Sequence, residues 1–190
     1  MYPVYHAGGA LSVIYIVMSL FSTIFSQILL AAELIGLWFT YKKMNLPGWK
    51  GIIPFYNFYI LFEELWEVKH FWRMIIYCVI FTVSFIIGEV LMIVGGVFSY
   101  NVTPDASLSV SGIVFVILGI LFFITALVMV IMMIVILVNI YRKTAKAFGL
   151  KKTWVWGLFF VPYIMFPIIG FNRKIVYYGP VEHLEKVEQA

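Results

Sequence analysis

The chain has 190 residues, of which 64% are hydrophobic and 12% are charged, and its mean hydropathy is +1.03. Because soluble domains carry about 25% charged residues, this composition excludes a soluble globular fold and predicts an all-α membrane protein. The net charge of +4 does not indicate a nucleic-acid partner. The basic residues instead gather at the ends of apolar runs, where they anchor helices and meet anionic lipid.

The first predicted element is a transmembrane helix over residues 10–40, which ends at a basic anchor. Residues 1–32 contain no charged side chain, and the run is longer than the roughly 20 residues that cross a bilayer. Small or polar residues at every seventh position share one helix face: Ser12, Ser19, Ser26, Glu33 and Thr40. We interpret this face, including Ser19 and Ser26, as a helix-packing surface; a polar conduction path is the alternative.

A shorter aromatic segment over residues 51–65 follows a turn at Pro47 and Gly48. Pro47 presets the turn, and Gly48 is expected to supply a positive φ. The segment contains Pro54 and has only about 12 residues before its first glutamate, which is too few to cross the membrane. It is predicted to be interfacial or re-entrant on the cytoplasmic side.

Two further spans are predicted at residues 71–98 and 112–140, joined by a polar external loop over residues 99–111. Glycines recur at seven-residue spacing in both spans, and we predict that they allow close helix packing. These glycines are Gly88, Gly95, Gly112 and Gly119.

The last apolar segment, residues 153–172, is long enough to cross the membrane, but Pro162 and Pro167 break it near its middle. If it turns back, all 13 Lys and Arg residues lie on one side of the membrane. The positive-inside rule therefore favours three spans, with the N-terminus outside and the C-terminus cytoplasmic; four spans are the alternative. Residues 1–178 are expected to form one transmembrane domain, and residues 179–190 a polar cytoplasmic tail.

Two glutamates lie inside predicted spans, where a charged side chain costs at least about 2.5–3.5 kcal/mol. Glu33 and Glu89 differ in depth by about 12 Å at 1.5 Å per residue, so we do not expect a direct pair. Asn139 and Gln27 are the candidate partners of Glu33. Glu33, Glu89 and Asn139 form a candidate intramembrane polar site for protons or cations; a structural hydrogen bond or a subunit contact is the alternative.

No catalytic or metal-binding pattern stands out in the sequence. The three histidines are far apart, and the serines lack the neighbouring His or Lys of a nucleophile motif. We therefore expect neither enzyme activity nor a metal ion or other cofactor.

The most distinctive string in the sequence is LPGWKGIIPFYNFY, residues 46–59. It resembles the PGW…IPFYN.Y signature of a bacterial polytopic membrane family of unknown function. The resemblance implies a module of the bacterial inner membrane. A similar module is fused ahead of some signal peptidase I domains, but no Ser–Lys peptidase domain follows in this sequence. The resemblance implies no activity.

The same string is typical of a hairpin at the membrane interface, because its Trp and Tyr side chains suit headgroup level. It is predicted to form a structural corner or, with the second proline-broken segment, a groove for lipid or a partner protein. The residues of this candidate groove are Pro47, Gly48, Trp49, Pro54, Tyr56, Asn57, Pro162 and Pro167.

Together these features favour a non-enzymatic integral membrane scaffold or accessory subunit, which forms homo-oligomers or binds another membrane protein. The alternative is a small channel or carrier for ions or lipid-like solutes that uses the intramembrane glutamates. The lipid bilayer is a partner in both cases.

Overall fold

A computed structural model describes residues 5–102 and 110–180, and all regular structure in these ranges is helical. Its elements are α1 (Tyr5–Lys43), the 3₁₀ helix η1 (Gly48–Gly51), α2 (Tyr56–Leu65), α3 (Val68–Val102), α4 (Val110–Ala147), α5 (Thr153–Phe160) and α6 (Pro162–Phe171). Within the described ranges, the helices α1, α3 and α4 are long and apolar enough to cross a membrane. The predicted all-α membrane fold with three spans is therefore confirmed.

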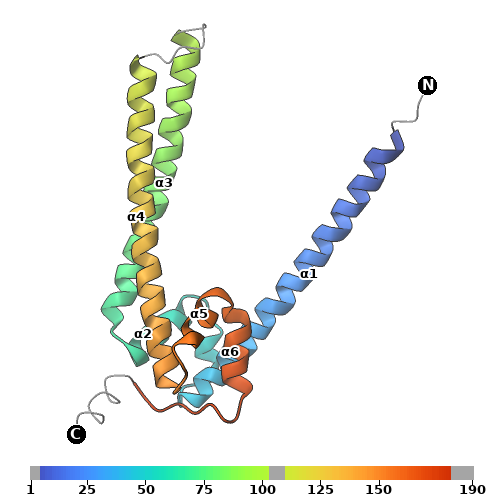
Figure 1. Cartoon of the computed structure of the whole chain (residues 1–190), viewed down its shortest axis with the longest axis vertical. Helices are drawn as coiled ribbons and strands as arrows, with labels where there is room; N and C mark the ends of the chain where they lie inside the picture. The colour runs from blue at the N-terminus through green and yellow to red at the C-terminus, as the bar shows by residue number, and fades with distance from the viewer. Residues whose placement is uncertain (1–4, 103–109, 181–190) are drawn as a thin grey trace.

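The molecule has the shape of a V (Figure 1). Helices α3 and α4 run side by side and form one arm, and α1 forms the other arm alone. The short elements η1, α2, α5 and α6 form a base from which both arms rise. The C-terminal end of α1, the N-terminal end of α3 and the C-terminal end of α4 therefore meet at the base.

The α3–α4 arm is packed through glycines at seven-residue spacing. A Cβ atom built on Gly95 would lie 3.1 Å from the carbonyl oxygen of Gly112, and one on Gly119 would lie 3.2 Å from that of Gly88. Seven residues are about two helical turns, so both contacts fall on the same side of each helix. The structure thus brings the four predicted packing glycines together in pairs.

Both proline-containing segments are divided into two elements. Between η1 and α2, Phe55 adopts φ 64°, a left-handed conformation that a bulky side chain rarely takes. Between α5 and α6, the helix breaks at Val161, because Pro162 has no N–H to continue the hydrogen-bond ladder. The predicted segment 51–65 therefore starts at the last residue of η1, bends over residues 52–55 and continues as α2, whereas the predicted segment 153–172 is two short helices joined by a bend.

The long helices extend past the predicted spans. α3 begins at Val68 and continues to Val102, and α4 continues through the basic residues after position 140 to Ala147. Residues 103–109 of the predicted external loop and residues 181–190 of the predicted tail lie outside the described residues.

The hydrophobic core lies in the base, where elements from the whole chain meet. Its large side chains are almost completely buried, and they come from α1, α2, α4, α5, α6 and the turn after α4: Tyr41, Phe62, Ile140, Phe148, Leu158 and Ile169. The arms, in contrast, expose apolar side chains along most of their length, as expected for helices whose solvent is lipid.

Helix α1 is attached to the base through its last two turns. A Cβ atom on Gly36 would lie 2.3 Å from the backbone nitrogen of Pro167, so the two backbones approach closely here. The Thr40 hydroxyl donates a hydrogen bond to the carbonyl of Phe166 at 3.3 Å. The Lys43 ammonium donates three hydrogen bonds to backbone carbonyls at or just after the end of α6: Ile169 at 2.7 Å, Asn172 at 2.6 Å and Ile175 at 2.9 Å.

The upper part of α1 has no such neighbour. Residues 11–28 are all exposed, and Ser19 and Ser26 donate their hydroxyl hydrogens to carbonyls of their own helix, at 2.8 Å in both cases. The predicted packing of Ser19 and Ser26 against another helix therefore does not occur within the described chain. α1 leaves the base at a wide angle to the α3–α4 arm (Figure 1), which explains why none of the described helices covers this face.

Candidate functional site

The segment of residues 46–59 packs against the lower end of α1. A Cβ atom on Gly48 would lie 2.7 Å from the Trp38 ring, and one on Gly51 would lie 3.0 Å from the Leu37 carbonyl oxygen. The expectation of a positive φ at Gly48 is wrong; the left-handed residue of this turn is Asn45, with φ 59°. Glycine is needed at position 48 because a side chain there would collide with the Trp38 ring, and not because of the backbone angle.

The aromatic residues of this segment form a continuous stack. The ring centroids of Trp49 and Tyr56 are 6.0 Å apart, and those of Tyr56 and Tyr59 are 6.1 Å apart, with nearly parallel planes. Tyr59 then meets Phe71 of α3 edge-on at 5.5 Å. Trp49 is half exposed, so the stack runs from the surface into the core.

Asn57 joins the segment to α1. Its backbone carbonyl accepts a hydrogen bond from the hydroxyl of Tyr41, and its side-chain oxygen accepts one from the Phe58 N–H at 2.6 Å. The Asn57 side chain thus satisfies an N–H in the first turn of α2, as capping residues do at helix starts.

The two halves of the candidate groove both pack against the end of α1. Pro167 contacts Gly36 on one side, and Gly48 contacts Trp38 on another. Pro162 is the first residue of α6, a position that proline favours because no N–H is required there. Neither of the two cavities described below is lined by the groove residues. Gly48 and Pro167 thus pack on the end of α1. The groove for lipid or a partner protein stays a prediction.

The structure does not bring the candidate intramembrane residues together. Glu33 is half-buried near the root of α1, Asn139 is half-buried in α4, and Glu89 is exposed on α3. Among the residues that the structure describes, none forms a hydrogen bond or an ion pair with either glutamate, so the expected Glu33–Asn139 hydrogen bond is not present.

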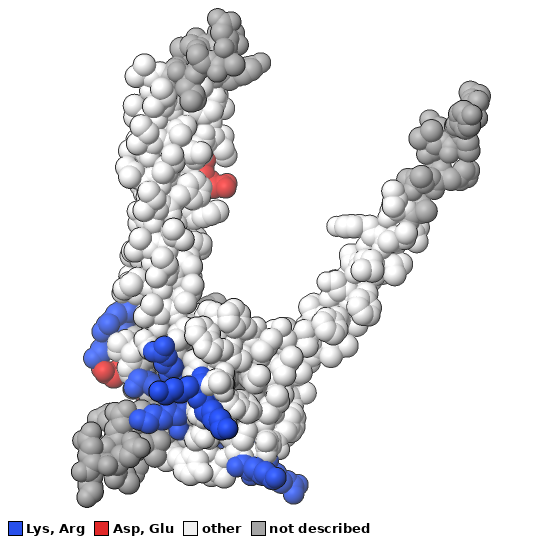
Figure 2. Space-filling view, in the orientation of Figure 1, with Lys and Arg blue, Asp and Glu red and all other residues white. Residues whose placement is uncertain are grey.

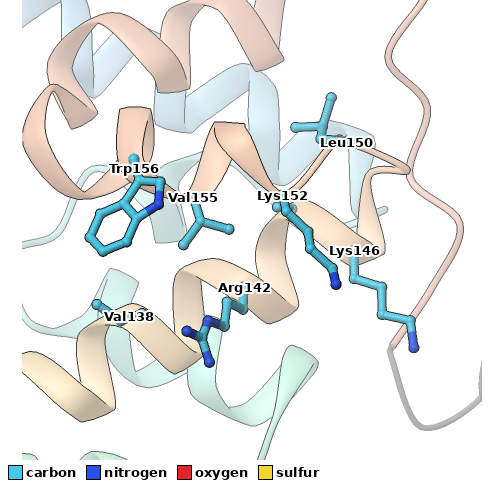
Figure 3. A pocket seen from close by; sticks show the side chains of 8 residues that line it. Val138, Arg142, Lys146, Leu150, Lys152, Val155 and Trp156 are labelled. Atoms are coloured by element: carbon cyan, nitrogen blue, oxygen red, sulfur yellow. The ribbon is translucent and has the colours of Figure 1, made fainter.

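A cavity of about 670 Å³ lies between the end of α4 and the start of α5 (Figure 3). Its wall consists of three cations and five apolar side chains: Arg142, Lys146, Lys152, Val138, Ala145, Leu150, Val155 and Trp156. The turn that brings α5 back to α4 contains Gly149 at φ 63°, where a Cβ atom would lie 2.8 Å from the Tyr178 ring. Glycine is required in this turn by both its backbone angle and its surroundings.

A second cavity, of about 430 Å³, lies beside the end of α2. It is lined by Glu63, Glu64, Leu65, Trp66, Glu67, Lys143 and Pro180. The Lys143 ammonium lies 5.5 Å above the Trp66 ring, and Trp66 stacks on His70 at 3.6 Å. A hydrogen bond from Lys69 is the main cause that lowers the pKa of the Glu67 carboxyl. The described residues contain no group of three or more His, Cys, Asp and Glu side chains placed to hold a metal ion.

The sequence did not indicate the first cavity, although one signal was present. Val138, Arg142 and Lys146 are spaced four apart and so share one face of α4. From the sequence alone these basic residues indicate only membrane anchors, because residue spacing does not predict the turn that places Lys152 and Trp156 opposite this face.

Comparison with protein-family models, with curated proteins and with solved structures found no match to this chain. The resemblance of residues 46–59 to a bacterial membrane family therefore stays a prediction.

Proposed function

We propose that this chain is a non-enzymatic scaffold of the bacterial inner membrane that assembles through the upper part of α1. The observation that supports the proposal is that one face of α1 is buried at its lower end and exposed above it. At the lower end of this face, Gly36 and Thr40 are covered by α6, whereas Ser19 and Ser26 on the same face are exposed. A partner helix above α6 would cover the rest of the face.

We assign the partner helix to α1 of a second copy. Apolar side chains gain little by leaving lipid for another helix, so helices in membranes associate where small residues let their backbones approach closely. A repeat of seven residues keeps such positions facing one partner over a long distance. A second α1, related by two-fold symmetry, carries the same repeat and makes a self-complementary contact.

We further propose that the base of the V lies in the cytoplasm and that the N-terminus is outside. Basic side chains gather over the base (Figure 2), at the ends of α1, α3 and α4 and in the turns beside them. The positive-inside rule favours the cytoplasm for such a surface. In this orientation α5 and α6 form a re-entrant pair, and η1 with α2 lies at the interface.

The alternative of a channel or carrier has less support. Glu33 and Glu89 belong to different arms of the V. Neither forms a hydrogen bond or an ion pair with any residue in the described ranges. The resemblance to a bacterial membrane family supports the location of the protein but suggests no transported solute.

Disulfide cross-linking in membranes tests the proposal. The free, exposed Cys78 is first replaced by serine, and a cysteine is then introduced as Ser19→Cys. Two such thiols join only when their Cα atoms come within about 7 Å of each other. We expect Ser19→Cys to give a disulfide-linked dimer of the chain under mild oxidation.

The matched control is Val17→Cys, which is also exposed on α1. Each residue turns a helix by about 100°, so Val17 points to nearly the opposite side from Ser19. Equal cross-linking at both positions, or none at Ser19, would reject assembly through this face. A cross-link from Ser19→Cys to a different protein would keep the scaffold role but replace the second copy as partner.

A further inference from the structure

The cavity between α4 and α5 combines cations and apolar side chains in an ordered way. Along one face of α4, Val138, Arg142 and Lys146 follow each other at four-residue intervals, from the apolar span toward the polar end of the helix. Lys152 and Trp156 line the cavity from α5 and the turn before it. Figure 3 shows Trp156, Val155 and Val138 together at one end, and the two lysines at the other.

None of the described residues that line the cavity is acidic. Arg142 and Lys152 are exposed and form no ion pair with any residue in the described ranges. Like charges that line one cavity repel each other, and an anion between them removes this cost. A guanidinium with a nearby ammonium is a favourable pair for a phosphate group, because arginine can bind two phosphate oxygens at once.

The apolar part of the wall indicates that a ligand of this cavity has an apolar group next to its phosphate. The volume of about 670 Å³ is in the range of small-molecule sites, and it is larger than a phosphate group requires. Val138 lies one turn deeper in the apolar span than Arg142. Trp156, which also lines the cavity, is 56% exposed. Tryptophan favours the level of the lipid headgroups, where its ring meets acyl chains and its N–H meets water.

We propose that this cavity binds an anionic phospholipid, with its phosphate between Arg142 and Lys152 and the start of an acyl chain against Val138 and Trp156. The order of cations and apolar side chains along α4 matches the order of headgroup and chain in a lipid of the cytoplasmic leaflet. The bound lipid bridges α4 and α5, and so it stabilises the turn that holds the α5–α6 pair on the base. This site does not depend on how α1 assembles.

Native mass spectrometry of the full chain in mild detergent tests the proposal. The protein is mixed with equal amounts of phosphatidylglycerol and phosphatidylcholine, and the bound fraction of each is measured. We expect a clear excess of phosphatidylglycerol. The double variant Arg142→Gln/Lys152→Gln should lower phosphatidylglycerol affinity by about tenfold or more, because it removes the charged hydrogen bonds to the phosphate.

The matched control is Arg173→Gln/Lys174→Gln, which removes the same charge from exposed positions of the base outside the cavity. It should keep the preference for phosphatidylglycerol. Equal binding of the two lipids, or an equal loss in both double variants, would overturn the proposal, because either result reduces the site to general surface charge. Circular dichroism of both variants checks whether they keep the parent's helix content.

Inorganic phosphate distinguishes a lipid from a free phosphate ligand. If the cavity holds a lipid, excess phosphate should leave phosphatidylglycerol bound, and Trp156→Ala should weaken lipid binding because it removes the apolar wall. If phosphate displaces the lipid and Trp156→Ala has no effect, the ligand is a soluble phosphate compound and the proposal of a lipid site is wrong.

Discussion

Lys43 is the residue that ties α1 to the end of α6. The last carbonyls of a helix have no partner within the helix, and its C-terminal end attracts cations. The Lys43 ammonium meets this need with three carbonyls at 2.6–2.9 Å. A basic residue at the end of a span was expected from the sequence, but as an anchor in lipid headgroups and not as a link between two helices.

Replacing Lys43 by methionine should therefore destabilise the base. We expect a loss of roughly 1.5–3 kcal/mol, because the charged hydrogen bonds disappear and the carbonyls at the end of α6 lose their partner. Thermal unfolding in detergent measures the change. Lys42→Met is the control, since it removes the same charge from an exposed neighbour whose ammonium lies 5.4 Å above the Trp38 ring. An equal loss in both variants would contradict the role of Lys43.

Tyr177 packs against Phe148, and its hydroxyl is buried without a hydrogen-bond partner among the described residues. Burial, with a smaller effect of the Glu64 charge, raises the pKa of the Tyr177 hydroxyl from 10 to about 12. The folded state thus favours the neutral phenol. The contribution of this hydroxyl to the free energy of unfolding is fully present below pH 10. It is lost as the pH rises from 10 to about 12, because the hydroxyl ionises first in the unfolded chain.

Tyr177→Phe should remove this part of the alkaline loss of stability. At neutral pH the variant should be as stable as the parent or slightly more stable, because an unpartnered buried hydroxyl costs free energy. Thermal melting of both proteins between pH 8 and pH 12 compares them directly. A large loss of stability at neutral pH would show that the hydroxyl has a partner.

At the scale of the elements, the α3–α4 pair depends on its glycines. The neighbours Gly95 and Gly96 differ sharply, because a Cβ atom on Gly95 would lie 3.1 Å from the Gly112 carbonyl oxygen, whereas one on Gly96 would meet nothing within 4 Å. Gly95→Leu should separate the helices and destabilise the arm by about 1–3 kcal/mol. Gly96→Leu should have little effect. Thermal unfolding of the two variants measures the difference, and equal stability would contradict the packing.

The long elements could be predicted from the sequence because hydropathy and length alone determine them. The heptads of Gly88/Gly95 and Gly112/Gly119 also indicated a packing face correctly placed on each helix. The seven-residue spacing on α1 could not show that Ser19 and Ser26 have no covering helix within the described chain. Residue spacing gives no information on the angle at which α1 leaves the base. Nor could it show the cavity beside Arg142, which depends on the turn at Gly149.

The orientation of the whole molecule in the membrane, with its base in the cytoplasm, can be tested separately. A C-terminal fusion to a fluorescent protein should fluoresce in cells, and a C-terminal fusion to alkaline phosphatase should be inactive, because both results require a cytoplasmic C-terminus. The control is to fuse the same two reporter proteins to the N-terminus, where the opposite results are expected. An active C-terminal phosphatase would place the base outside the cell and contradict the three-span orientation.

One arm of the V consists of a single helix, α1. α1 has 39 residues, or a length of about 58 Å, and only its lower end is packed on the rest of the chain. In the proposed assembly, a second copy would pack its own α1 against the exposed serines and so cover this face in both molecules. Assembly is therefore part of the proposed fold as well as of the proposed function.

The mass of the protein particle in mild detergent tests this assembly most directly. We expect a mass of two chains of 21.9 kDa each, after correction for bound detergent. Ser19→Phe/Ser26→Phe should give single chains, because the large rings keep the helices apart, and Val17→Phe/Ile24→Phe on the opposite side of α1 should remain dimeric. A parent protein that runs as a single chain, or a dimer that survives Ser19→Phe/Ser26→Phe, would contradict assembly through this face.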